Sequence, residues 1–137
     1  MIPYLVAVLA CCIAGAMGGY ILARPQEALE RRGLAGGDGA LTGLAAARGF
    51  GAMLLMAHAG AAGMLGYYPS VGAAMALALA LLWAGAAIGR LASHILDGQG
   101  DSASVQTLLV EAMMGLCLSL PFWAARQIAF TGPTVTV

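Results

Sequence analysis

Charged residues are scarce in this sequence, and lysine is absent. Only 9% of the 137 residues are charged, and six arginines balance six acidic residues to a net charge of zero. A soluble domain carries charge on about a quarter of its residues, so this chain has too few charges to cover a globular surface. With no lysine and no net charge, no basic patch is present to neutralise phosphates, so nucleic acid is not a predicted partner.

Side chains that bind metals are also few. Cys11, Cys12 and Cys117 lie in apolar runs, and the adjacent pair has neither zinc-site nor thioredoxin spacing. We interpret all three as small apolar side chains, with a redox role as the alternative. No CxxCH haem motif occurs, and His58 and His94 are expected at different depths of the fold. The sequence therefore predicts no metal site.

Long apolar runs are what the chain has in abundance. Hydrophobic residues make up 61% of the sequence, and its mean hydropathy is +0.89. A helix needs roughly 20 apolar residues to cross a bilayer, and four runs reach about that length. They are residues 2–23, 41–65, 71–91 and 105–123. Short connections make consecutive helices antiparallel neighbours. The predicted fold is all-α: an integral membrane four-helix antiparallel bundle in one domain, residues 1–126, followed by an irregular tail, residues 127–137.

A short polar helix is expected after the first run, over residues 25–32. Pro25 suits a first helical turn, and Glu27 with Arg31 is a favourable pair at i,i+4. A glycine cluster at residues 36–39 ends this segment. We expect the helix to lie on the membrane surface.

Two GxxxG pairs, Gly15 with Gly19 and Gly85 with Gly89, permit close approach of helices. The chain also shows weak internal similarity. An offset of 63 residues aligns the second run with the fourth and places Arg48 opposite Glu111, which suggests a duplicated hairpin.

Topology is predicted from the arginines. The connection between the first and second runs holds Arg24, Arg31 and Arg32, and the connection between the third and fourth is flanked by Arg90. Arginine-rich connections stay in the cytoplasm. Both connections are therefore predicted to be cytoplasmic, and both termini are predicted to lie outside.

Three ionisable residues lie inside the apolar runs: Arg48, Arg90 and Glu111. Antiparallel packing brings them to similar depth, so we expect them to form one cluster, with a bidentate ion pair and a spare guanidinium. Ser93 and Asp97 share a helix face with Arg90 and are candidates to orient it. Two interpretations stay open: a charge network that fixes helix register, or a site for a carboxylate, phosphate or carbonyl ligand.

His58 is the remaining candidate. It lies ten residues after Arg48, which is about 15 Å deeper along a helix. A histidine hydrogen-bonded in helix packing is one interpretation, and a haem ligand or proton relay is the other.

These motifs resemble a known family. The segment Arg48-Gly49-Phe50-Gly51, the segment Gly89-Arg90-Leu91 with Ser93 and Asp97-Gly98, and Glu111 are similar to the bacterial membrane family catalogued as domain of unknown function 4345. That family is similar in layout to DoxX-like four-helix membrane proteins. The resemblance implies a bacterial inner-membrane protein with an Arg/Arg/Glu cluster and no settled activity. Some DoxX-like relatives are associated with quinone-linked oxidoreductases, which is an analogy at the level of fold.

The sequence leaves three functions open. The first is a non-catalytic accessory or binding subunit of a larger membrane complex, with lipid and a membrane protein or a second copy as partners. The second is a small oxidoreductase or a quinone- or lipid-binding protein whose ligand site is the cluster; a quinone or another apolar ligand is then the candidate cofactor. The third is a transporter, which would need an oligomer to complete a polar pathway.

Overall fold

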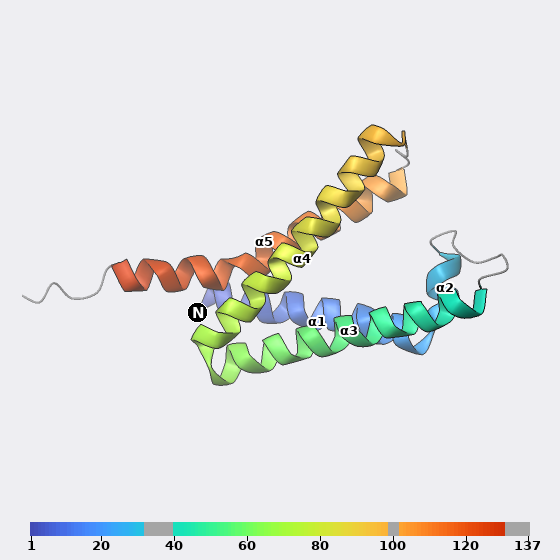
Figure 1. Cartoon of the computed structure of the whole chain (residues 1–137). Helices are drawn as coiled ribbons and strands as arrows, with labels where there is room; N and C mark the ends of the chain where they lie inside the picture. The colour runs from blue at the N-terminus through green and yellow to red at the C-terminus, as the bar shows by residue number, and fades with distance from the viewer. Residues whose placement is uncertain (32–39, 99–101, 131–137) are drawn as a thin grey trace, which may run out of the picture.

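The computed structural model describes the backbone of residues 1–31, 40–98 and 102–130, and the side chains within these ranges except at 40–42 and 126–130. Every element in these ranges is an α-helix. In chain order the helices are α1 (Ile2–Ala23), α2 (Pro25–Glu30), α3 (Ala40–Tyr67), α4 (Pro69–Leu96) and α5 (Ser102–Phe130). The four long helices are apolar enough to cross a membrane (Figure 1). The predicted all-α bundle of four spans is confirmed.

The helix boundaries follow local chemistry. Proline occupies the first turn of α1, α2 and α4, where its missing N–H would have no helical partner. The connection between α3 and α4 is a single residue, Tyr68, which is tighter than the five-residue turn expected over residues 66–70. Helix α4 ends at Leu96, and Gly98 just beyond it has a φ of 66°, which suits glycine.

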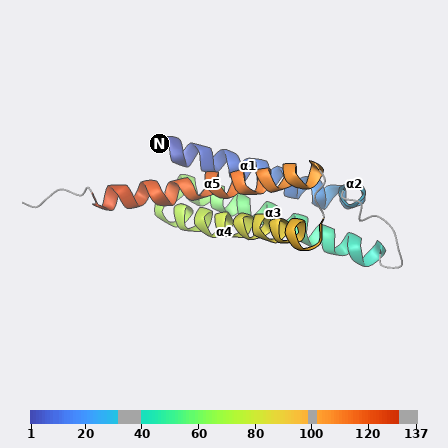
Figure 2. The ribbon, with the colours of Figure 1, turned by 90° about the horizontal axis from the view of Figure 1, so that it is seen from above.

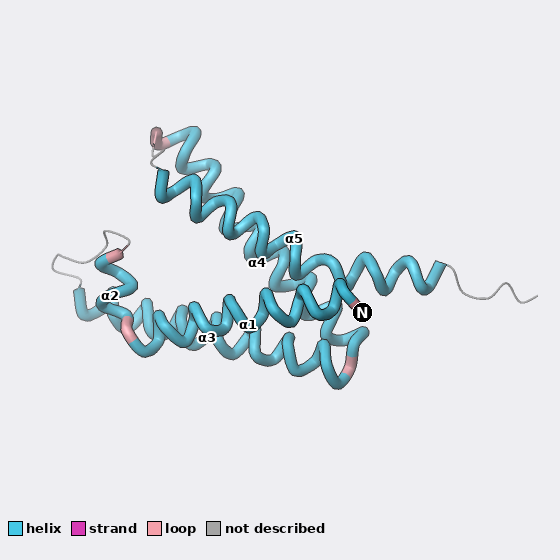
Figure 3. The backbone as a smooth tube through the Cα atoms, turned by 180° about the vertical axis from the view of Figure 1, so that it is seen from behind, coloured by secondary structure: helices cyan, strands magenta, loops and turns pink. Residues whose placement is uncertain are grey.

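Helix α5 extends further than the sequence analysis placed it. The tail was expected to begin at Gln127, but α5 continues through Phe130; residues 131–137 lie outside the described ranges. Pro121 lies inside this helix and cannot donate a hydrogen bond to the carbonyl of Cys117, a defect that bends helices. Helix α5 changes direction along its length in Figure 1 and Figure 3.

The long helices form a ring in which α1 neighbours α3 and α5, and α4 neighbours the same two. Figure 2 shows them side by side from above. The most extensive packing is within two pairs, α1 with α3 and α4 with α5. Figure 1 shows the two pairs diverging toward the end at which α4 stops and α5 starts. The buried core is largely alanine, including Ala7, Ala14, Ala61 and Ala76, because small side chains let helix backbones come close.

A close helix contact lies between α1 and α3, at Gly18 and Gly51. A β-carbon at Gly18 would lie 2.6 Å from the backbone nitrogen of Leu55, and one at Gly51 would lie 2.6 Å from that of Leu22. The GxxxG pairs do not serve this purpose as expected. Gly15 approaches side chains of α3, but no atom lies within 4 Å of a β-carbon built at Gly19, Gly85 or Gly89.

Candidate functional site

An ion pair joins α4 to α5 where these helices run together. The Nε of Arg90 donates to Oε2 of Glu111 at 3.0 Å, and its Nη2 donates to Oε1 at 2.7 Å. Glu111 is 6% exposed, whereas about a third of the Arg90 side chain is accessible. Two parallel hydrogen bonds use the planar fork of the guanidinium and fix its orientation. The sequence analysis expected a bidentate pair within the cluster without specifying which arginine forms it, and in the structure it is Arg90.

The need for this pair follows from helix geometry. Side chains on an α-helix lean toward its N-terminus, so Arg90, six residues before the end of α4, leans away from the nearby helix end and into the bundle. Glu111 lies in the first half of α5. Its side chain leans toward the N-terminus of α5 and so reaches the level of the Arg90 side chain. A buried ion pair contributes little net stability, but loss of one partner leaves the other charge uncompensated. The pair joins α4 to α5 at this level.

The third predicted member of the cluster, Arg48, is not part of this pair. It lies on α3, its side chain is exposed, and it makes no hydrogen bond or ion pair to any residue in the ranges described. The physical reason is that α3 belongs to the other helix pair, which diverges from α4 and α5 at this end (Figure 1). Similar depth along the helices was not enough to bring all three residues together.

Ser93 and Asp97 do not orient Arg90 in this structure. Among the described residues, neither side chain is hydrogen-bonded to the guanidinium, which is held by Glu111 instead. Ser93 and Asp97 are linked to each other through their backbones: the N–H of Asp97 donates to the carbonyl of Ser93 at 2.9 Å and closes the last turn of α4. Asp97 is exposed.

His58 is 1% exposed and uses both ring nitrogens. Its Nδ1 lies 2.8 Å from the carbonyl oxygen of Leu54, and Nε1 of Trp83 donates to its Nε2 at 3.0 Å. An indole N–H can only donate, so Nε2 accepts and the proton of the neutral ring is on Nδ1. This arrangement is the helix-packing interpretation of His58. The sequence carried a signal for this contact: the indole N–H of Trp83 lies in mid-span and needs a hydrogen-bond acceptor.

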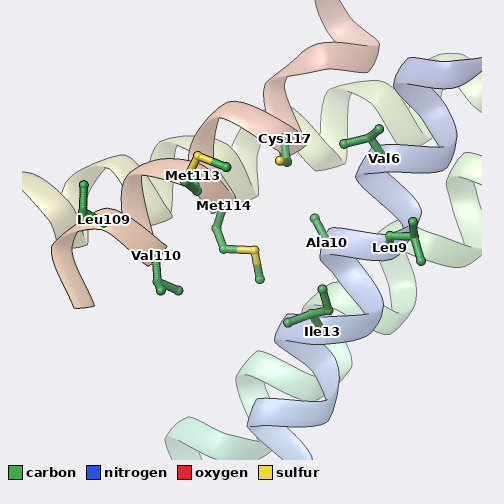
Figure 4. A pocket seen from close by; sticks show the side chains of 9 residues that line it. All are labelled: Val6, Leu9, Ala10, Ile13, Leu109, Val110, Met113, Met114 and Cys117. Atoms are coloured by element: carbon green, nitrogen blue, oxygen red, sulfur yellow. The ribbon is translucent and has the colours of Figure 1, made fainter. Parts of the chain in front are cut away.

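An apolar groove lies between α1 and α5. Its volume is about 440 Å³, and only apolar side chains line it. Figure 4 shows α1 presenting Val6, Leu9, Ala10 and Ile13 toward Met113, Met114 and Cys117 of α5. Several of these side chains are more than half exposed, among them Leu9 at 63%. Glu111 follows the lining residue Val110 directly in α5, so the ion pair lies at the level of one end of the groove.

Within the residues described, no three His, Cys, Asp or Glu side chains gather as metal ligands. The three cysteines are free thiols, with Cys11 buried and Cys12 exposed. Cys117 is half-buried and faces the groove. The buried side-chain nitrogens and oxygens in these ranges all have hydrogen-bond partners.

Comparison with known proteins supplies a family but no activity. The model of the family described as Domain of unknown function (DUF4345) matches residues 4–124, which includes all four spans and the Arg90–Glu111 pair. The chain belongs to this family. No curated protein and no solved structure matches the chain. The resemblance noted in the sequence is thus confirmed for DUF4345, while the likeness to DoxX-like proteins and the link to quinone chemistry stay predictions.

Proposed function

We propose that this DUF4345 protein is a non-catalytic membrane protein that binds the apolar chain of a lipid or quinone-like molecule in the groove between α1 and α5. The groove carries the proposal, because its volume is within the range of small-molecule sites. Its lining offers no polar group, so an aliphatic or isoprenoid chain fits its chemistry.

The state of the buried polar groups favours binding over catalysis. Both oxygens of Glu111 accept from Arg90, and both nitrogens of His58 are hydrogen-bonded. A general acid or base must reach a proton on the substrate, and these groups are already committed to internal contacts. An oxidoreductase built on Arg48, Arg90 and Glu111 would require the ion pair to open and α3 to approach α4 and α5.

The groove can be tested by filling it. The protein is purified in mild detergent, and co-purifying apolar molecules are measured by native mass spectrometry. Leu9→Trp adds a large ring at a lining position, and Leu82→Trp is its matched control on α4, where the side chain is 69% exposed and does not line the groove. We expect a bound apolar molecule in the wild type and in Leu82→Trp, and its loss in Leu9→Trp. Equal retention in both variants would contradict the proposal.

An accessory-subunit function is the second candidate, and one observation favours it. Gly85 and Gly89 of α4 have open space around them and are exposed, so a helix of another membrane protein can approach this face closely. Gly85→Leu should then weaken association with a co-purifying membrane protein, while Gly19→Leu on the open side of α1 should not. Purification as a monomer without a partner would argue against this candidate.

A further inference from the structure

Arg48 differs from the other arginines whose side chains the structure describes, because it has no partner in the described ranges. The other three are each matched: Arg24 by Glu27 at 3.1 Å, Arg31 by the ring of Tyr20 at 5.7 Å, and Arg90 by Glu111 at 2.7 Å. Yet Arg48 lies within the span Gly43–Tyr67. A guanidinium in a membrane span is costly unless an anion, water or the headgroup region receives it.

The burial pattern relates the two helix pairs to each other. An offset of 69 residues places buried Ala7 and Gly18 of α1 on buried Ala76 and Ala87 of α4. The 63-residue offset places buried Gly51 of α3 on Met114 of α5, which is also buried. Several positions of the two helix pairs therefore correspond in burial, although exposed Arg48 falls on buried Glu111. This agrees with the suggested duplication.

The charged positions follow the same correspondence but differ in chemistry. Glu111 in the second pair corresponds to Arg48 in the first, and Arg90 corresponds to Ile21. Where the second pair has a cation and an anion, the first has an isoleucine and a cation. Ile21 is 9% exposed and cannot compensate the charge of Arg48. Among the residues that the structure describes, the first helix pair thus has a positive charge without a partner at a defined position.

The direction of the side chain indicates where this charge goes. Arg48 is five residues from the start of its span at Gly43, about 8 Å along the helix. Side chains lean toward the helix N-terminus, which here is the nearer end of the span. The long aliphatic stem lets an arginine reach the headgroup level from such a depth. Arg90, near a helix C-terminus, leans the opposite way and is matched internally.

We propose that Arg48 is a binding site for the phosphate group of an anionic phospholipid at the membrane surface next to the N-terminal end of α3. A guanidinium donates two parallel hydrogen bonds to a phosphate and stays charged at every relevant pH. An anionic lipid also removes the uncompensated positive charge, which a zwitterionic lipid with its own ammonium group does less well. The site does not use the groove between α1 and α5, so it stands whether or not the groove binds a ligand.

Native mass spectrometry of the full chain in detergent tests this proposal. Phosphatidylglycerol and phosphatidylcholine with identical acyl chains are added in turn, and the fraction of protein that carries each lipid is measured. The wild type should prefer phosphatidylglycerol, and Arg48→Gln should lower the phosphatidylglycerol-bound fraction several-fold. Arg48→Lys, which keeps the charge, should retain most of the binding.

Arg31→Gln is the matched control, because it removes an exposed guanidinium outside the spans. It should leave the bound fraction unchanged. Equal binding by wild type and Arg48→Gln, or no lipid preference in the wild type, would overturn the proposal. Displacement of the lipid by millimolar inorganic phosphate would overturn the lipid assignment, because it would show that the free ion alone satisfies Arg48. The groove variant Leu9→Trp should keep its phosphatidylglycerol preference, which separates this site from the proposed function.

Discussion

Gly18 and Gly51 pack backbone against backbone: a β-carbon on either glycine would lie 2.7 Å from the carbonyl oxygen of the other. This contact fixes the separation of α1 and α3, the two helices that pack most extensively against each other. It predicts that even a methyl group at Gly18 forces the helices apart. Overpacking of this kind costs about 1–3 kcal/mol, so Gly18→Ala should lower the midpoint of thermal unfolding in detergent.

Gly19→Ala is the control for that experiment. It makes the same chemical change one residue along the same helix, where the β-carbon meets no atom within 4 Å. Alanine has the higher helix propensity, so Gly19→Ala should leave stability unchanged or raise it slightly. If both variants lose stability equally, the close contact does not limit the packing of α1 on α3.

Loss of Arg90 should destabilise the protein much more than loss of an exposed arginine. Arg90→Gln leaves the buried carboxylate of Glu111 without its guanidinium, a change that costs about 3 kcal/mol or more. Arg24→Gln breaks the exposed pair with Glu27 and should cost less than about 1 kcal/mol. Thermal unfolding of both variants gives the comparison. Restoration of stability in Arg90→Gln by a second change, Glu111→Gln, would identify the unpaired charge as the cause.

The hydrogen bond from Trp83 to His58 should be measurable as a coupling between α4 and α3. Trp83→Phe removes the donor and leaves Nε2 of His58 without a partner, which should cost about 1 kcal/mol beyond the loss of ring packing. A double-mutant cycle with His58→Leu isolates this energy. Additive effects of the two substitutions would show that the bond contributes nothing to the packing of α3 on α4.

Membrane orientation is a prediction that the arginines carry. In a variant with the native cysteines replaced by alanine, Ser70→Cys should react with a membrane-impermeant maleimide in intact cells. Asp97→Cys, near the opposite end of α4, should react only after the membrane is permeabilised. Both positions are exposed, so a difference between them reports sidedness. The reverse labelling pattern would invert the predicted topology.

Much of the fold was predictable because each span depends on local composition. The residues 2–23 coincide with α1, and the break at Gly98 follows from the backbone freedom of glycine. The end of α5 was misplaced although no glycine or proline occurs between Gln127 and Gly132 that would end the helix earlier. These features were predictable because each depends on residues within a single helix.

The contacts between helices were less predictable. Depth along the helices predicted that Glu111 would pair with an arginine, but it did not distinguish Arg90 from Arg48. The exclusion of Arg48 depends on the divergence of the two helix pairs (Figure 1), and the use of Gly18 in place of Gly19 depends on how α1 is rotated. Rotation and divergence are collective properties of all four helices. Sequence spacing within one helix does not determine them.

The division into two helix pairs has a consequence for biosynthesis. Each closely packed pair consists of two long helices that are consecutive in the chain: α1 with α3, and α4 with α5. The first pair can therefore assemble in the membrane while the ribosome is still translating the second. The junction between the pairs forms later: the hydrogen bond from Trp83 to His58 needs α4, and the packing of α1 on α5 needs α5.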